Sequence, residues 1–201
     1  MVASTNAGKV REICHELMTA GLTDWQVESL DRLLNYKPPD EDQPSFTGNA
    51  IIKAMAAARH TGQLCLADDS GLCVDGLGGR PGIHSARYAG NHASDADNNA
   101  RLMAEIAPLT DDGRIAFYRC VIALALPNVL LAVFSGELAG RLISTPRGTG
   151  GFGYDPYFFL PDYGCTAAEL PLEVKAKISH RGQAIRRAIK WLERYTVPAA
   201  A

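Results

Sequence analysis

The stretch RIAFYRCVIALALPNVLLAVFSGELAGRLI, residues 114–143, decides the fold class of this chain. Two long apolar segments, rich in β-branched and aromatic residues, flank Pro127-Asn128, a pattern that predicts two strands joined by a tight turn. Segments on either side of this hairpin, such as residues 94–107 and 180–195, space their apolar residues as helices do. We therefore expect an α/β fold with a mixed sheet and flanking helices.

Size and composition indicate an ordinary globular protein. The chain has 201 residues, 47% of them apolar, which suffices for the core of one domain spanning residues 1–201. The formal net charge of −2 gives no general attraction to nucleic acid or to an anionic membrane, so neither is expected as a partner. The longest apolar stretch is interrupted by Pro127-Asn128 and is too short for a membrane-spanning helix. Five cysteines without a C-x-x-C pair predict buried thiols and a reducing, cytoplasmic compartment.

The glycine-rich segment RGTGGFGYDP, residues 147–156, has the spacing G-x-G-x-x-G at Gly148, Gly150 and Gly153. A dinucleotide-binding turn needs a helix directly after these glycines. Here Asp155-Pro156 follows, and then the aromatic run YFFLP that is typical of a strand, so a Rossmann site is not predicted. Four glycines within six residues instead indicate a backbone that passes very close to a flat or charged partner.

The segment STNAGKV, residues 4–10, has the character of a phosphate-binding loop. It follows a short apolar segment and opens a predicted helix, where backbone amides and the helix dipole favour an anion. Lys9 adds a positive charge. The segment is not a Walker A loop, because the position of the first glycine is Ala3 and Lys9 is followed by Val10.

The segment ADDSG, residues 67–71, places Asp68, Asp69 and Ser70 at the expected end of a short apolar strand. Ligands in α/β proteins bind at strand ends, and adjacent carboxylates repel unless a cation or a donor pairs with them. Carboxylate oxygens suit Mg²⁺, which takes one or two of them together with substrate phosphates.

Two further clusters complete the polar inventory. Phe152, Tyr154 and Asp155 lie within the glycine-rich segment, and an aromatic beside glycines can form a stacking platform for a base. The segment KAKISHRGQ, residues 175–183, places four basic residues near the start of the last helix, where they can bind a carbonyl and a phosphate: Lys175, Lys177, His180 and Arg181.

Each cluster also has a purely structural interpretation. Residues 4–10 can be a helix start capped by Asn6 with a surface lysine, and residues 67–71 can be a turn with capping aspartates. The glycine-rich segment can be a loop whose aromatic residues belong to the core, and residues 175–183 can form a solvated basic face. Taken together, however, the clusters supply what a nucleoside triphosphate site needs: phosphate-binding amides, metal carboxylates, a base platform and donors for a base edge.

These segments resemble the Ham1, or inosine triphosphatase, family. The resemblance rests on STNAGKVRE, ADDSGL.VD.LGG.PG..SARY, PRGTGGFGYDP.F and K..ISHRGQA, in this order and over nearly the whole chain. It implies a long mixed central sheet with flanking helices, two lobes around a deep cleft, and a homodimer. It also implies Mg²⁺-dependent hydrolysis of ITP, dITP and XTP to the monophosphate and pyrophosphate, which removes deaminated purines from the nucleotide pool.

The resemblance further assigns roles to single residues. Asp69 matches the proton acceptor and metal ligand, with Asp68 as its support and Lys53 beside the reacting phosphate, while Glu41 matches a second metal ligand. The expected substrate contacts are Ser4, Thr5, Asn6, Ala7, Gly8, Lys9, Ser70, Phe152, Gly153, Tyr154, Asp155, Lys175, His180 and Arg181. Among these, His180 and Arg181 match the pair that contacts the base. Lys177 matches no functional position.

Alternatives from other classes stay open at this point. A Maf-type pyrophosphatase acting on pyrimidine nucleotides is one, although the SHR and GGFGYDP segments argue against it. A nucleotide-binding module without catalysis is another. One departure from the family is Gly48, which stands where the family often has Glu, so we expect weak capping of the alanine-rich helix over residues 46–62.

Overall fold

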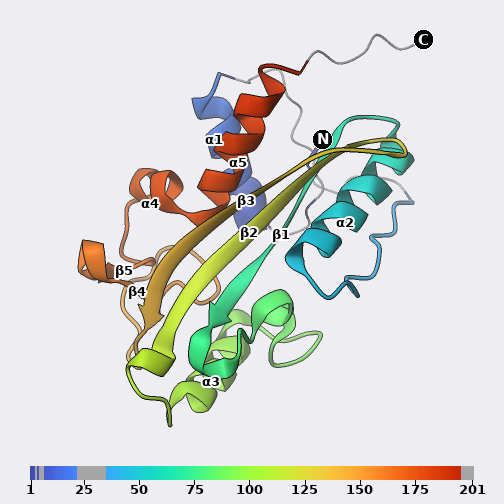
Figure 1. Ribbon diagram of the computed structural model, residues 1–201. Coiled ribbons are helices and arrows are strands. Elements are labelled where there is room, and N and C mark those ends of the chain that lie inside the picture. Colours follow the sequence, from blue (N-terminus) through green and yellow to red (C-terminus); the bar gives the residue numbers. More distant parts are fainter. Residues whose placement is uncertain (3, 5–6, 22–34, 196–201) are drawn as a thin grey trace. The chain divides into compact units, whose positions relative to one another are not determined.

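The computed structural model describes residues 1–2, 4, 7–21 and 35–195 (Figure 1). The chain divides into two compact units, and each is described here by itself. Unit 1 comprises Met1–Asp69, Val121–Gly136 and Arg181–Ala201, and unit 2 comprises Ser70–Cys120 and Glu137–His180. The expected single domain stays a prediction.

Helices and strands both occur along the chain, as expected for an α/β fold. The α-helices are α1 (Ala7–Thr19), α2 (Phe46–Thr61), α3 (Asp95–Ile106), α4 (Leu172–Ile178) and α5 (His180–Leu192), with short 3₁₀ turns between some of the elements. The strands form one sheet in the order β1 (Cys65–Val74), β2 (Ile115–Leu126), β3 (Val129–Leu142), β4 (Phe158–Leu160) and β5 (Cys165–Thr166). The predicted fold class is confirmed.

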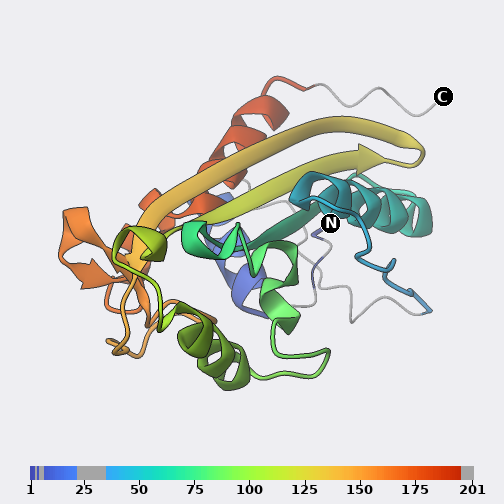
Figure 2. The same ribbon diagram turned by 60° about the horizontal axis from the view of Figure 1, so that its bottom comes forward.

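The predicted hairpin is present as β2 and β3, the two long neighbouring strands of Figure 2. Proline holds φ near about −65°, and Asn128 has φ 65°. This sequence of signs matches a type II turn, which tolerates asparagine at its second central position. The Asn128 side chain also accepts a hydrogen bond from Arg59 Nε of α2, at 3.2 Å, so the turn is attached to a helix of the same unit.

The short strands extend the sheet beyond β3. β4 pairs antiparallel with β3, with Leu142 opposite Phe158, and β5 pairs antiparallel with β4, with Leu160 opposite Cys165. At the other edge, Val2 forms a parallel bridge to Leu66 of β1, which makes the pairing mixed as expected.

The structure corrects one boundary. Residues 67–71 were expected at the end of a short strand, but β1 continues through them to Val74. The expectation was wrong because aspartate is disfavoured in strands on average, whereas here Asp68 and Asp69 each have cationic partners that make the buried position tolerable.

Unit 1 carries helices on both faces of its part of the sheet, with α1 and α5 on one side of the long strands and α2 on the other (Figure 1). α1 and α5 are joined by an ion pair between Glu16 and Arg186, whose atoms are 2.8 Å apart. In α5 the buried residues Ile185, Ala188 and Ile189 recur at helical spacing and form one face. In α2 the buried residues are mostly small, which permits close packing: Ala50, Ala54, Ala57 and Ala58.

The start of α2 corrects a second expectation. Gly48 removes the acidic partner of a capping box, but the helix is still capped, because Ser45 Oγ accepts a hydrogen bond from Gly48 N at 3.1 Å. At the other end, Gly62 adopts φ 71° and closes the helix.

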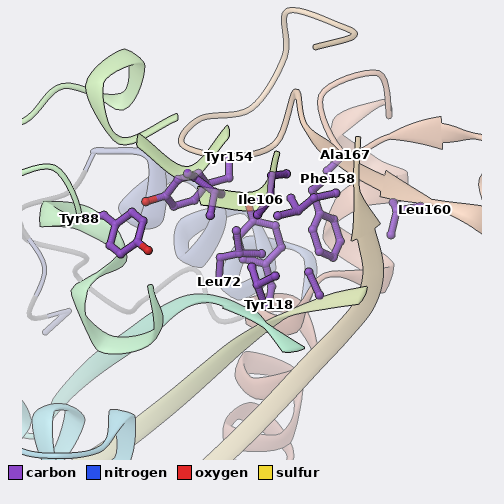
Figure 3. Packing of buried hydrophobic residues seen from close by; sticks show 12 residues of the cluster. Leu72, Tyr88, Ile106, Tyr118, Tyr154, Phe158, Leu160 and Ala167 are labelled. Carbon is purple, nitrogen blue, oxygen red and sulfur yellow. The ribbon is translucent and has the colours of Figure 1, made fainter. Parts of the chain in front are cut away.

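Unit 2 has its own aromatic and aliphatic core, shown in Figure 3. Tyr118 and Phe158 pack with ring centroids 4.6 Å apart, and α3 contributes Leu102 and Ile106. α3 begins with a capping box, because Ser94 and Asp97 exchange hydrogen bonds with each other's backbone amides. α3 is therefore fixed both by its cap and by the core.

Two further predictions concern the whole chain. All five cysteines carry free thiols, and Cys65, Cys73 and Cys120 are buried, as expected. Within the described residues, no helix combines the length and apolar character needed to cross a bilayer.

Candidate functional site

The centre of the candidate site in unit 1 is the acidic pair of β1. Asp68 is 2% exposed and Asp69 is 4% exposed, so both carboxylates are buried within the strand. Successive side chains of a strand point to opposite faces of the sheet. Asp68 accordingly contacts residues of α1 and α5, whereas Asp69 contacts residues of α2. The predicted repulsion is thereby relieved, because each carboxylate has cations of its own.

Asp68 is held by two cations on its side of the strand. Its Oδ2 lies 3.1 Å from Lys9 Nζ and 3.4 Å from Arg181 Nε. Arg181, itself 2% exposed, also pairs with Glu12 of α1. Burial alone would raise the pKa of Asp68, but Lys9, Arg181 and Lys53 outweigh it and hold the pKa well below its ordinary value. Asp68 is therefore a permanent anion that links α1, β1 and α5.

Asp69 has a different environment on the other side. Its Oδ1 lies 3.0 Å from Lys53 Nζ, and its Oδ2 accepts a hydrogen bond from Asn49 Nδ2 at 3.2 Å. Burial raises the pKa of Asp69, and this effect exceeds the opposing influence of Lys53 and Lys9. Burial lowers the pKa of Lys53, but its carboxylate neighbours prevail and raise it. The pKa values of these neighbouring carboxyls are thus shifted in opposite directions, a pattern typical of pairs with separate chemical roles.

The predicted metal ligands Asp69 and Glu41 meet at one point. Lys53 Nζ is 3.1 Å from Glu41 Oε1 and 3.0 Å from Asp69 Oδ1, so both carboxylates converge on the same ammonium group. Within the described part of the chain, no cluster of three or more His, Cys, Asp or Glu residues could hold a metal by itself. Two hard oxygen ligands fit Mg²⁺, which completes its coordination with water and phosphate oxygens.

The predicted phosphate-binding loop is only partly described. Ser4 and Gly8 are buried, and Lys9 lies in the first turn of α1, which begins at Ala7. Thr5, Asn6 and the side chain of Ala7 lie outside the described residues, so the alternative of an Asn6 cap stays untested.

In unit 2, residues 152–155, for which the sequence predicts contacts with the base, form a loop organised around Asp155, called the base loop below. The Asp155 Oδ2 atom accepts a hydrogen bond from Phe152 N at 2.9 Å and pairs with Lys175 Nζ at 2.7 Å. The same Lys175 Nζ lies 5.1 Å from the centre of the Phe152 ring, within the range of a cation–π interaction. Lys175, Asp155 and Phe152 are thus brought together within unit 2.

The glycines of this loop are needed for contacts with the protein itself. Gly150 N donates to Ala168 O at 3.0 Å, and a Cβ atom at Gly150 would lie 2.8 Å from that oxygen. A Cβ atom at Gly151 would lie 2.1 Å from Asp155 Oδ2. The expected close partner is therefore found, and in the described residues it is a backbone carbonyl and a carboxylate.

Tyr154 follows the structural interpretation of its cluster. Its ring belongs to the core of unit 2 (Figure 3), and its hydroxyl donates to Ser85 O at 2.8 Å. Ser70, the other predicted contact on β1, is half-buried.

The basic residues of the last cluster do not gather on one helix. α4 ends at Ile178 and α5 begins at His180, so Lys175 and Arg181 lie on different helices. His180 stacks on Tyr118 in unit 2, with ring centroids 4.8 Å apart and planes 9° apart, while Arg181 pairs with Asp68 in unit 1. Lys175 and Lys177 thus lie on a short helix that precedes the last one, because Ser179, with an extended ψ of 150°, separates α4 from α5.

Comparisons with known proteins identify the family. A profile of the Ham1 family matches residues 1–191. This protein belongs to the Ham1 family. It is 49% identical over 185 residues to the dITP/XTP pyrophosphatase of Geobacter sulfurreducens, and the match covers 92% of each chain. It is 45% identical over 194 residues to that of Desulforamulus reducens, covering 96% of this chain and 95% of the other. The structure of a HAM1 protein from Coxiella burnetii has a TM-score of 0.84 at 37% identity, covering 96% of this chain and 98% of that one.

Some residues of this Ham1 protein that contact the predicted site residues were not themselves predicted from the sequence. Glu12 pairs with Arg181, and Asn49 donates to Asp69. The available signal was helical spacing: Glu12 follows Lys9 by three residues, and Asn49 precedes Lys53 by four, so each lies on the same helix face as a predicted residue.

Replacing Asp68 by asparagine should destabilise the protein strongly. Removing one partner of a buried ion pair typically costs about 3–5 kcal/mol, because Lys9 and Arg181 would lose their carboxylate. A lowered pKa stabilises the fold above the ordinary value of 3.8, and this contribution fades as the pH falls below it. Urea unfolding should therefore show a large difference between wild type and Asp68→Asn at pH 7 and a smaller one near pH 3.

The control for that comparison is Asp111→Asn, which removes an exposed ion pair with Arg141. It should change the stability little at either pH. Equal stabilities of Asp68→Asn and wild type at pH 7 would contradict the anchoring role of Asp68.

Replacing Gly151 by alanine should disrupt the base loop. Gly151 has φ 74° and Gly164 has φ 64°, so alanine is strained by about 1–2 kcal/mol at either site. Only at Gly151 would the new methyl group collide with Asp155. Thermal unfolding should show Gly151→Ala to be clearly less stable than Gly164→Ala. If the two melt together, the close approach of Asp155 to the loop is wrong.

Proposed function

We propose that this protein hydrolyses dITP, ITP and XTP to the monophosphate and pyrophosphate, and thereby removes deaminated purines from the nucleotide pool. The relatives named dITP/XTP pyrophosphatase match more than nine-tenths of the chain. The observation that carries the proposal is the group formed by buried Asp69 and Lys53 with half-buried Glu41, which combines a base, a cation and a second carboxylate.

The chemistry is attack of water on the α-phosphorus, with cleavage of its bond to the oxygen that leaves with pyrophosphate. Asp69 would accept the proton of the attacking water, and its raised pKa makes it a stronger base than an ordinary aspartate. Lys53, 3.0 Å from Asp69, and Lys9 would stabilise the negative charge that develops on the leaving group. Asp68 would hold Lys9 in place, since its own charge is fixed.

The residues present suit a divalent cation, and we propose Mg²⁺ held by Asp69 and Glu41. When bound, Mg²⁺ supplies charge neutralisation on the phosphate oxygens. Because both carboxylates contact Lys53 Nζ, the ammonium group occupies the point where a cation is favoured. Lys53 would then be free to move toward the phosphate chain.

For base recognition we propose the loop of residues 152–155 with Lys175, together with His180 and Arg181. Phe152 is the aromatic side chain of this loop that is not in the core, which suits stacking on a purine. Hypoxanthine and xanthine present an oxygen acceptor at position six, whereas adenine presents an amino donor there. Donors from Arg181 and His180 would therefore be satisfied by the first two bases and left unpaired by adenine, at about 1–3 kcal/mol for each buried donor.

Membership of the Ham1 family favours this activity over that of a Maf-type enzyme acting on pyrimidine nucleotides. A binding module without catalysis is the second alternative. Pyrophosphate release from ITP, XTP, dUTP and UTP, with and without Mg²⁺, separates all three: the proposal requires Mg²⁺-dependent release from ITP and XTP.

We also propose that the protein acts in the cytoplasm as a homodimer, without nucleic acid or membrane partners. Five free thiols agree with a reducing compartment. The dimer follows from the family resemblance, and light scattering on the purified protein tests it.

Replacing Asp69 by asparagine should abolish most turnover and leave nucleotide binding intact. Loss of one group that acts on the transition state costs on the order of a hundredfold or more in kcat. In the wild type, kcat should fall as the pH drops through the raised pKa of Asp69, because the protonated carboxyl cannot accept a proton. Steady-state kinetics from pH 4 to pH 9 measure both effects, and a kcat of Asp69→Asn near that of wild type would remove Asp69 from the mechanism.

Replacing Arg181 by lysine should reduce the preference for ITP over ATP. Lysine keeps a positive charge beside Asp68 but lacks the planar donors of arginine. We expect the ratio of kcat/KM for ITP to that for ATP to fall by about tenfold, in line with one lost donor. Arg186→Lys is the matched control, because Arg186 also joins α5 to a glutamate of α1 and should not change the ratio. An unchanged ratio in Arg181→Lys would limit Arg181 to anchoring Asp68.

A further inference from the structure

We propose that Asp95 and Asn99 of α3 are positioning residues that hold the peptide groups around Gly153 and thereby orient Phe152 for the purine base. This inference rests on the proposed function, because it assigns a specificity role within the base loop. Neither residue belongs to a motif that pointed to the family.

The contacts are made on both sides of one residue. Gly153 N donates to Asp95 Oδ2 at 2.7 Å, and Asn99 Nδ2 donates to Gly153 O at 3.0 Å. Asp95 and Asn99 are four residues apart in α3, so they lie on one face of the helix. Gly153 has φ 61°, a conformation that glycine adopts readily, and the two side chains fix it there.

Holding Gly153 also restricts the residue before it. Phe152 N is bound by Asp155 Oδ2 at 2.9 Å, and the peptide that follows Phe152 is the one whose N–H is bound by Asp95. The backbone of Phe152 is therefore held at both ends. Its ring lies 5.1 Å from Lys175 Nζ, so a change in the backbone would move the ring away from the lysine that the proposal places in the base site.

α3 is held at its start and by the core, so it can serve as the support. Its first turn is closed by the Ser94–Asp97 capping box, and Leu102 and Ile106 anchor it in the core of unit 2. Asn98, next to Asn99, accepts a hydrogen bond from Ala89 N at 2.8 Å. Two polar side chains of one helix turn thus bind two separate loops. Asn98 binds the loop of residues 86–89, and Asn99 binds the base loop.

Within the described part of the chain, the amide group of Asn99 has only one of its two ends satisfied. Its Oδ1 atom is buried and accepts no hydrogen bond from any residue that the structure describes. Buried polar atoms without a partner are rare and call for an explanation. Placing the amide nitrogen on Gly153 O is the explanation that the geometry offers.

The two acidic residues in the first turn of α3 provide a matched pair for the test. Asp95 reaches the loop, whereas Asp97 bonds to Ser94 within its own helix cap. Asp95→Ala and Asp97→Ala each remove one carboxylate from the same helix turn, and only the first removes a contact with Gly153. Asp95→Asn retains an oxygen that can accept the Gly153 N–H and serves as the conservative rescue.

The kinetic test compares these variants with ITP and XTP at saturating Mg²⁺. We expect Asp95→Ala and Asn99→Ala to raise KM about tenfold while kcat stays within about threefold of wild type, and Asp95→Asn to restore most of the KM. Asp97→Ala should melt at a lower temperature, because it loses the helix cap, yet keep the KM of wild type. If Asp95→Ala and Asp97→Ala have the same KM, the positioning role is overturned.

A second measurement does not depend on activity. Hydrogen exchange of the Gly153 amide, followed by NMR, should be at least tenfold faster in Asp95→Ala than in wild type and unchanged in Asp97→Ala. Equal exchange in Asp95→Ala and wild type would overturn the inference whatever the kinetics. If wild type fails to hydrolyse ITP and XTP while the exchange result holds, the proposed function fails and the attachment of the loop to α3 stands.

Discussion

Two adjacent carboxylates inside a buried strand are the constraint on which unit 1 depends. Taking a charge out of water is costly unless an opposite charge accompanies it. The alternation of a strand sends Asp68 and Asp69 to opposite faces, so the helices on each face must supply the cations. Lys9 and Arg181 meet Asp68, and Lys53 meets Asp69. The placement of α1, α2 and α5 around β1 is therefore tied to electrostatics as much as to apolar packing.

The base loop of unit 2 is also organised around a buried carboxylate that pairs with a cation, but this carboxylate binds the backbone of the loop as well. Here one carboxylate, Asp155, organises a backbone segment by accepting from Phe152 N and pairing with Lys175. Glycine at position 151 leaves room for that carboxylate, and glycine at position 150 leaves room for Ala168 O. The loop is thus shaped by contacts with its own unit, and α3 adds the bonds to Gly153.

Local patterns predicted much of this, and long-range contacts account for the rest. The hairpin, the cap of α3 and the close approach at the glycines follow from turn chemistry and from the space that a side chain needs, which can be read from a few neighbouring residues. The extension of β1 through Asp68 and Asp69 could not be predicted in this way, because it depends on cations from other elements, Lys53 for Asp69 and the still more distant Lys9 and Arg181 for Asp68. The helix break at Ser179 was also missed, because neither glycine nor proline marks it in the sequence.

The shared anion at Asp68 has a consequence for how this sequence can change over evolutionary time. Lys9 and Arg181 both depend on one carboxylate, and Arg181 depends in addition on Glu12. A neutral replacement at any of these positions removes a partner of another buried charge, so single steps are selected against even where a joint replacement would be tolerated. The four positions should therefore vary together or stay fixed, which slows sequence change in α1, β1 and α5 at once.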